Sequence, residues 1–449
     1  AYFGSRWRCV NYLKHIYLSI YYYISMSLLK AKNATFQAAM KVTILIGQWF
    51  GINPVLGVCE ADTSKMRFKL FSARCLYGIL SAIGQTMLVV YCLMKLFCDD
   101  NFRLASSTSL IFYGTNAFTG ILFLRLAMQW PKLCQHIART ELIDPNTDFG
   151  LVRRCHLSCI SILVLALVEH LLSGVSGITI SMDCQPDTML YDAFLLTSFP
   201  LVWTFVPYNR IYGAVLQFLN FQSTFNWNFS DAFVVSVSLY LISRLDQINK
   251  RIKDVKGKDV PSYFWRITRE DYTRVSNLVK KVDDVISGIV FISFANNLFF
   301  ICMQLLHTLE PQNHARSWSH DRCQLGQPMR GYEQAVYHLY SFLFLLGRSM
   351  TVSLIAAKVH SASKEPAQAL YEVPSSGFCM EVQRFLNQVH CDTVALSGLQ
   401  FFNVKRGLVL SIAGTVVTYE LVLMQFTGVT PTSSPPIGGS STTFNPLDA

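Results

Sequence analysis

The sequence predicts an all-α integral membrane protein with seven transmembrane helices, and three observations support this prediction. Of the 449 residues, 51% are hydrophobic and only 15% are charged, whereas soluble domains carry about a quarter charged residues. The apolar residues gather into runs of roughly 20, the length that crosses a bilayer core. The Lys and Arg residues alternate between the loops on the two sides of these runs.

Seven runs have the length of membrane-spanning helices. They lie at 73–98, 106–128, 156–180, 193–219, 285–309, 334–358 and 407–426. An eighth apolar stretch, 38–58, contains Lys41, Asn53 and Pro54, and charged and polar groups are costly in hydrocarbon. We therefore expect this stretch to be a re-entrant or interfacial helix that packs under the bundle, within a cytoplasmic N-terminal region of residues 1–72.

The positions of the cations predict the orientation. The loops after the second, fourth and sixth spans are rich in Lys and Arg, and the stretch 250–281 alone contains ten. The loop 181–192 contains Asp183, Asp187 and Asp192 but no cation. By the positive-inside rule the N-terminus is cytoplasmic and the C-terminus extracellular. This orientation is the reverse of a G-protein-coupled receptor, and the sequence also lacks a DRY-type triplet after the third span.

The polar segments between and after the spans complete the predicted organisation. Residues near 229–285 extend the fourth and fifth spans with helical apolar spacing, so we expect helices of an intracellular assembly (anchor) domain, or alternatively surface helices on the lipid. Segment 359–406 completes this anchor. Tail 427–449 is rich in Pro, Gly, Ser and Thr and is predicted to be disordered and extracellular. The sequons at Asn33 and Asn228 fall on the cytoplasmic side, so neither is expected to carry glycan.

The last span carries a polar stripe, which favours a pore. Five side chains fall within about 40° of Ser411 on a helical wheel. They are Ser411, Thr415, Thr418, Val422 and Gln425. Several copies of such a helix suit a narrow aqueous lumen, with Val422 as an apolar constriction. Alternatively, the Ser and Thr hydroxyls pack helices together. Glu420 lies opposite the stripe and is expected to fix the helix against its neighbours, and Tyr419 borders the stripe.

The end of this span resembles a known family. The stretch "TYELVLMQF" (418–426) is similar to the Thr-Tyr-hydrophobic-Gln-Phe signature of insect gustatory receptors, and Glu420 resembles their sugar-receptor branch. Further similar stretches are "GQWFGINPVLGV" (47–58), "LRLAMQWPKL" (124–133), "VEHLLS" (168–173), "FNWNFSDAF" (225–233), "REDYTRVSNLV" (269–279) and "SFANNLFFICMQLL" (293–306). The resemblance runs from about residue 35 to 427.

The resemblance implies a function and an assembly. It implies a ligand-gated, non-selective cation channel in the plasma membrane of sensory neurons, built as a homotetramer, or as a heteromer with related receptors, around one central pore. Each subunit would hold a sugar, a mono- or disaccharide, in the outer half of its bundle. Thr418, Val422 and Gln425 take the positions of pore-lining residues.

A sugar site needs aromatic faces for the apolar C–H groups and amides or carboxylates for the hydroxyls. The outer halves of the third to sixth spans offer both. The candidates are Glu169, His170, Trp203, Asn296, Asn297, Gln304, Tyr337 and Tyr340. Glu169 is ionisable at membrane depth, with His170 or a ligand hydroxyl as its expected partner. Alternatively, Glu169 and His170 form a structural pair, and Asn296 and Asn297 form bonds between helices.

Other classes of protein fit less well. A secondary transporter of small polar solutes would also bury such groups, but it would normally show internal repeats, which the sequence lacks. A gustatory receptor for a non-sugar tastant is a further alternative. No HExxH, GxSxG or Gly-rich phosphate loop indicates an enzyme. The thirteen cysteines form no CxxC pair, so we expect neither a metal nor a cofactor.

Overall fold

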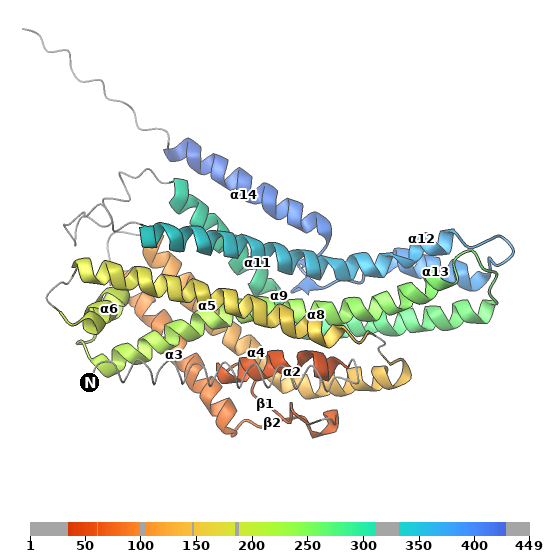
Figure 1. The fold of residues 1–449 in the computed structure, drawn as a ribbon, viewed down its shortest axis with the longest axis horizontal. Helices are drawn as coiled ribbons and strands as arrows, with labels where there is room; N and C mark the ends of the chain where they lie inside the picture. The colour runs from red at the N-terminus through yellow and green to blue at the C-terminus, as the bar shows by residue number, and fades with distance from the viewer. Residues whose placement is uncertain are drawn as a thin grey trace, which may run out of the picture.

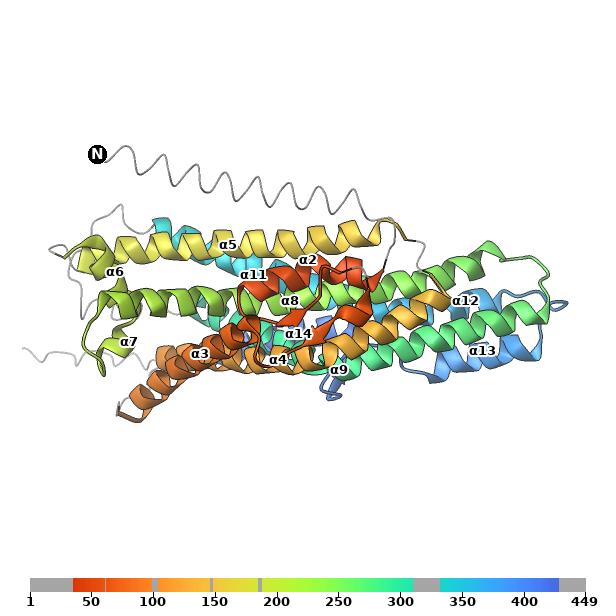
Figure 2. The ribbon, with the colours of Figure 1, turned by 90° about the horizontal axis from the view of Figure 1, so that it is seen from below.

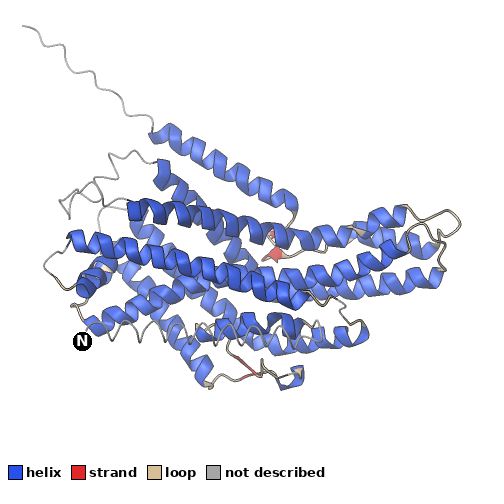
Figure 3. Ribbon diagram, in the orientation of Figure 1, coloured by secondary structure: helices blue, strands red, loops and turns tan. Residues whose placement is uncertain are grey.

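The computed structural model describes residues 35–60, 62–98, 104–145, 148–184, 188–309 and 332–427. The described part is almost entirely helical, with two small pairs of strands (Figure 3). The helices form an elongated bundle (Figures 1 and 2). The predicted tail from residue 428 onward and the first 34 residues, with Asn33, lie outside the described residues.

The helices follow one another with short connections. They are α2 (Phe36–Trp49), α3 (Ala73–Cys98), α4 (Leu104–Ile143), α5 (Leu151–Cys184), α6 (Leu190–Ser198), α7 (Pro200–Trp203), α8 (Arg210–Asp254), α9 (Ser262–Leu309), α11 (Tyr332–Lys364), α12 (Pro366–Tyr371), α13 (Met380–Cys391) and α14 (Arg406–Thr427). The short elements are β1 (Val55–Leu56), the 3-10 helix η1 (Thr63–Lys65), β2 (Arg67–Phe68), β3 (Ser397–Gly398) and β4 (Phe402–Asn403).

Helix α2 is shorter than the expected stretch 38–58. It begins at the N-cap Thr35, whose hydroxyl accepts a hydrogen bond from the Ala38 N–H at 3.3 Å. It ends at Trp49 because Gly51 and Asn53 adopt left-handed backbone conformations, with φ of 77° and 53°. The chain then forms strand β1, which pairs antiparallel with β2.

Five helices in the described part are long and apolar enough to cross a membrane. They are α3, α4, α5, α9 and α11. Helix α14 is apolar as well, but fewer of its residues qualify. Helix α8 has 45 residues but is too polar by composition, because it contains both "NWNFSD" and "DQINKRIKD". The described residues therefore form a multi-pass, mostly helical membrane protein.

The expected fourth span, 193–219, is not one continuous helix. The chain instead forms α6 and α7, and α8 begins only at Arg210. Proline explains the interruption, because Pro200 starts α7 and Pro207 lacks an N–H group and disfavours helical structure before it. Asn209 then caps α8, since its side-chain oxygen accepts hydrogen bonds from the N–H groups of Ile211 and Tyr212 at 2.9 and 3.2 Å.

Helix α8 is the centre of the bundle. Every residue from 226 to 238 is buried, and the helix contacts α5, α9 and α11. Aromatic side chains fill its surroundings: the ring of Phe123 lies 5.3 Å from Phe229 and 5.4 Å from Phe233. Polar side chains on this buried stretch must find partners inside the protein. They form part of the site described below.

One end of the bundle lies beyond the membrane-crossing length, since α8 and α9 continue past the other helices there (Figure 1). Helices α12 and α13 lie beside these extensions (Figure 2). Ion pairs join them: Arg269 of α9 to Glu381 of α13 at 3.0 Å, and Lys256 to Glu372 at 2.6 Å. These are the segments 229–285 and 359–406 of the predicted anchor, whose role in assembly stays a prediction.

Candidate functional site

Two polar clusters lie between α5, α8, α9 and α11. The first, the Glu169 cluster, consists of Glu169, Gln304 and Ser341. The Ser341 hydroxyl donates a hydrogen bond to the Glu169 carboxylate at 2.5 Å and accepts one from the Gln304 amide at 2.9 Å. A single buried serine thus joins α5, α9 and α11. The printed partner of Glu169 is Ser341, and not the neighbouring His170.

Two tyrosines of α11 lie beside the Glu169 cluster. Tyr337 is half-buried one turn before Ser341. The Tyr340 hydroxyl donates to the backbone oxygen of Leu165 on α5 at 3.0 Å, and its ring stacks on Phe344 at 6.2 Å. The sequence-predicted residues Glu169, Gln304, Tyr337 and Tyr340 therefore lie in one region. Together they offer a carboxylate, an amide and two aromatic faces.

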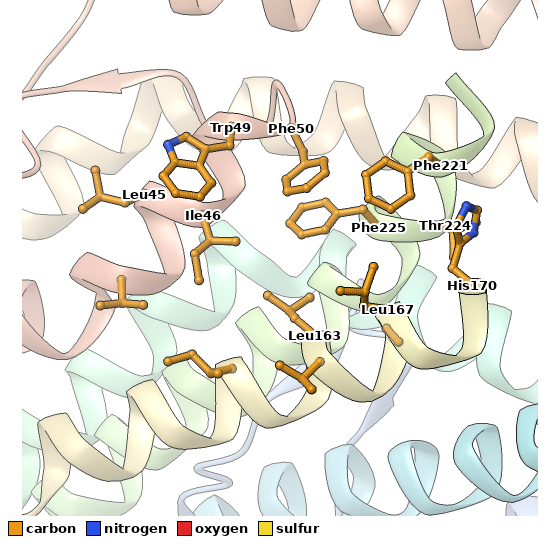
Figure 4. A pocket seen from close by; sticks show the side chains of 14 residues that line it. Leu45, Ile46, Trp49, Phe50, Leu163, Leu167, His170, Phe221, Thr224 and Phe225 are labelled. Carbon is orange, nitrogen blue, oxygen red and sulfur yellow. The ribbon is translucent and has the colours of Figure 1, made fainter. Parts of the chain in front are cut away.

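His170 faces a different space, on another side of α5. It lines an apolar cavity of about 580 Å³ between α2, α5 and α8. Figure 4 shows His170 at one end of this cavity, beside Phe221, with Phe50 and Phe225 along the wall. The rings of Phe50 and Phe225 stack at 3.5 Å, and those of His170 and Phe221 lie 5.0 Å apart. Such walls suit an apolar molecule better than one covered with hydroxyl groups.

Trp203 packs away from the Glu169 cluster. Its indole N–H donates to the backbone oxygen of Leu195 on α6 at 3.0 Å. Its ring lies 5.0 Å from Tyr208 and 6.0 Å from Tyr212, within an apolar group that includes Leu88 of α3. The structure thus gives Trp203 a packing role between α3, α6 and α8, and its binding role stays a prediction.

The second cluster, the Arg348 cluster, lies deeper in the bundle. Its members are Asn228, Asp231, Ser293, Asn297 and Arg348. Arg348 pairs with Asp231, with Nε and Oδ2 3.0 Å apart, and donates to the Asn297 side-chain oxygen at 3.1 Å and to Asn228. Asn297 donates to Asp231 at 3.0 Å, and Ser293 also donates to Asp231. The guanidinium lies 4.5 Å from the Trp227 ring, which adds a cation–π contact.

The two clusters are stacked along the same helices. Gln304 and Asn297 are seven residues apart on α9, and Ser341 and Arg348 are seven apart on α11. Seven residues are about two turns, or roughly 10 Å. One polar column therefore runs between α9 and α11, which contact each other and α8. Asn296, the neighbour of Asn297, is also buried.

The polar stripe of α14 lies on the outside of the bundle. Figure 1 shows α14 as a separate rod beyond α11 and α9. The side chains of Ser411, Thr415, Thr418, Tyr419 and Val422 are exposed. Each of the three hydroxyls donates to the backbone oxygen four residues earlier, at 3.1, 2.9 and 2.9 Å. The side chains of Glu420 and Gln425 lie outside the described set.

Sequence reasoning missed the charged pair and the serine. Arg348 interrupts the apolar run "LFLLGRSMTV", and Asp231 interrupts "NFSDAF". Each is a lone charge in a segment that is otherwise uncharged, and such charges require a partner. Pairing these two opposite charges was thus available as a signal. Ser341 carried no such signal, because a serine in a membrane helix is common.

The described residues contain no group of three or more His, Cys, Asp or Glu side chains that could hold a metal ion. The chemistry of the site is therefore hydrogen bonding and charge within an apolar bundle. Its groups can recognise a hydroxyl-bearing molecule, since hydroxyls donate to the carboxylate and accept from the amide.

Comparison with known proteins identifies relatives over most of the chain. Residues 27–433 match the trehalose receptor family. The Drosophila melanogaster gustatory receptor for sugar taste 64f is 33% identical over 88% of this chain and 81% of that receptor. The Drosophila melanogaster gustatory receptor 5a for trehalose is 31% identical over 88% of this chain and 86% of that receptor.

The fold has a counterpart among solved structures. The insect olfactory receptor OR5 from Machilis hrabei, in complex with eugenol, superposes with a TM-score of 0.59 at 12% identity. The match covers 86% of this chain and 97% of that one. At this identity the likeness concerns the fold alone. From the match over residues 27–433 and the sugar-taste relatives, the chain belongs to the trehalose receptor family of insect sugar-type gustatory receptors.

Proposed function

We propose that the chain forms a ligand-gated cation channel that opens when a sugar binds at the Glu169 cluster. The observation that carries this proposal is the Ser341 hydroxyl, which alone connects Glu169 of α5 to Gln304 of α9. A sugar hydroxyl has the same donor and acceptor capacity as a serine hydroxyl. A sugar can therefore replace these bonds and change how α5, α9 and α11 are held together.

An apolar contact connects this cluster to the last helix. Phe300 lies one turn from Gln304 on α9, and Leu345 lies one turn from Ser341 on α11. Both belong to an apolar group against which Val416 of α14 packs. A displacement of α9 or α11 at the sugar site is therefore transmitted to α14 by direct contact.

The exposed stripe of α14 supports a pore. The hydroxyl protons of Ser411, Thr415 and Thr418 are used within the helix, so the oxygen lone pairs face outward. A ring of such oxygens favours cations. We propose that four copies of α14 surround the lumen, with Val422 as its constriction and Gln425 as a polar ring.

The proposal includes the assembly and the orientation. Seven spans cross the plasma membrane of sensory neurons, with the N-terminus in the cytoplasm and the C-terminus outside. The distribution of cations in the loops supports this orientation. The subunits form a homotetramer, or a heteromer with related receptors, and the extended ends of α8 and α9 with α12 and α13 form the cytoplasmic anchor.

Whole-cell recording tests the proposal. The chain is expressed alone in a cell line, and a panel of mono- and disaccharides is applied. An immediate cation current that persists when G-protein signalling is blocked is the expected result. Saturable uptake of sugar without such a current would contradict the channel and favour a transporter.

A further inference from the structure

A second cleft, separate from the Glu169 cluster, lies between α3, α4 and α8. It has a volume of about 270 Å³, and we name it the Gln85 cleft. Gln85 of α3 and Asn226 of α8 line it, together with Gly120 of α4 and the turn at Phe50. The remaining lining residues are mostly apolar, and none of them is charged.

The two amides of this cleft are incompletely satisfied. The side chains of Gln85 and Asn226 are 1% and 2% exposed, and the Asn226 amide N–H donates to the Gln85 side-chain oxygen at 3.5 Å. The Gln85 amide nitrogen and the Asn226 side-chain oxygen have no partner among the described residues. Exchanging O and N in both amides leaves the same result, one donor and one acceptor without a partner. Buried groups of this kind are costly, so a bound molecule that satisfies both is strongly favoured.

The cleft opens toward lipid rather than toward the bundle interior. Ile83 and Met87 of α3 and Ile121 of α4 line it, and they are 54%, 49% and 56% exposed. Both helices belong to those apolar enough to cross a membrane. A molecule dissolved in the bilayer can therefore enter between α3 and α4.

Glycine keeps the cleft open. A Cβ atom added at Gly120 would lie 4.0 Å from its nearest neighbour, the Cβ of Ala82, so larger side chains at this position extend into the cleft. On the opposite side, Gly78 allows the backbone of Gly51 to approach, since an added Cβ would lie 2.5 Å from the Gly51 oxygen. This contact holds the turn after α2 against α3 and completes the wall.

We propose that the Gln85 cleft binds the hydroxyl group of a neutral membrane amphiphile, such as a sterol or a diacylglycerol. One hydroxyl can donate to the Asn226 oxygen and accept from the Gln85 amide. The apolar body then lies against Ile83, Met87 and Ile121. A phospholipid headgroup fits poorly, because no Lys or Arg lines the cleft. Water alone also fits poorly, because each buried water needs two to four polar partners and the walls are apolar.

The test is the thermal stability of the full chain in lipid nanodiscs, which does not depend on sugar binding or on current. Phosphatidylcholine discs contain cholesterol, the 3-methyl ether of cholesterol, or dioleoylglycerol. Because the ether cannot donate, we expect cholesterol or dioleoylglycerol to raise Tm by roughly 2–4 °C more than the ether. The lipid that does so identifies the source of the hydroxyl. Equal Tm values with all three lipids would overturn the proposal and indicate that the cleft holds water only.

Matched glycine variants locate the effect. Gly120→Leu fills the cleft and is expected to abolish the difference between cholesterol and its ether. Gly114→Leu is the control on the same helix, because an added Cβ there meets nothing within 4 Å and Gly114 does not line the cleft; it is expected to keep the difference. A difference that persists in Gly120→Leu would place the sterol elsewhere on the surface and overturn the proposal.

Discussion

Arg348 and Asp231 form an ion pair at the centre of the bundle, with Nε and Oδ2 3.0 Å apart and side chains that are 2% and 0% exposed. Asn228, Asn297 and Ser293 satisfy the remaining hydrogen-bonding groups of the pair. A charge this deeply buried is tolerated only with such partners. The pair therefore fixes the relative positions of α8, α9 and α11.

Removing one member of this pair is expected to be strongly destabilising. Arg348→Met leaves the Asp231 carboxylate buried without its countercharge, which costs about 3–5 kcal/mol. Thermal unfolding of the detergent-purified receptor measures the loss, and Asp231→Leu added to Arg348→Met is expected to recover part of it. The control is the exposed pair Lys65–Glu60 at 3.3 Å, where Glu60→Gln is expected to change stability by less than about 1 kcal/mol. Equal effects at the two pairs would contradict the assigned role.

Glu169→Gln is expected to raise the sugar concentration for half-maximal current by about 10- to 100-fold. The reason is the loss of a charge-assisted hydrogen bond, which contributes about 1.5–3 kcal/mol. Concentration–response curves from whole-cell recordings measure the change. An unchanged half-maximal concentration removes Glu169 from the ligand site.

Ser341→Ala is expected to shift the same curve, because it breaks the link between α5 and α9. Ser349→Ala is the matched control on α11, since the Ser349 hydroxyl bonds only to the backbone oxygen of Leu345 in its own helix, at 2.7 Å. We expect the control to behave as the wild type. If both variants respond alike, the Ser341 link has no part in the response to sugar.

Gln425→Ala is expected to change ion permeation while the half-maximal sugar concentration stays nearly constant. Gln425 belongs to the predicted stripe, which is about 20 Å along the helix from Ser411 at 1.5 Å per residue. Reversal potentials under bi-ionic conditions measure permeation. Val417→Ala is the control, because Val417 is exposed but lies off the stripe. A parallel loss of affinity and permeation would move Gln425 out of the pore.

The attachment of α13 to α9 is expected to weaken in acid. The hydrogen bond from Arg269 lowers the pKa of Glu381 below its usual value. A carboxyl group whose pKa is lower in the folded state stabilises the protein above the unfolded pKa of about 4.3, and this stabilisation is lost as the pH falls through the lower folded value. The Tm of the wild type is therefore expected to fall more steeply below about pH 4 than that of Glu381→Gln. Parallel curves for the two proteins would contradict this role of the pair.

Much of the fold could be predicted from local sequence. The predicted spans 73–98 and 407–426 agree with α3 and α14 to within one residue at each end, because apolar runs of this length leave few alternatives. The fourth span differed because Pro200 and Pro207 divide it, and hydropathy alone does not register a missing N–H group.

The candidate site could be predicted less completely. Glu169, Gln304 and Tyr340 lie together because each is in the outer half of its predicted span, so depth in the membrane was informative. Rotation about the helix axis was not: His170 and Trp203 have suitable depth but face other neighbours. The pairing of Arg348 with Asp231 joins residues 117 positions apart in the chain, and no local pattern specifies such a contact.

Helix α9 runs unbroken for 48 residues, a rod of about 72 Å at 1.5 Å per residue. One end carries Arg269 and the other carries Gln304, so a single stiff lever bears both the contact with α13 and the Glu169 cluster. Selection cannot tune these two places independently. A substitution that alters taste threshold by tilting this lever also perturbs how the subunit is tethered, and compensating changes between the two ends are the expected trace of that coupling among related receptors.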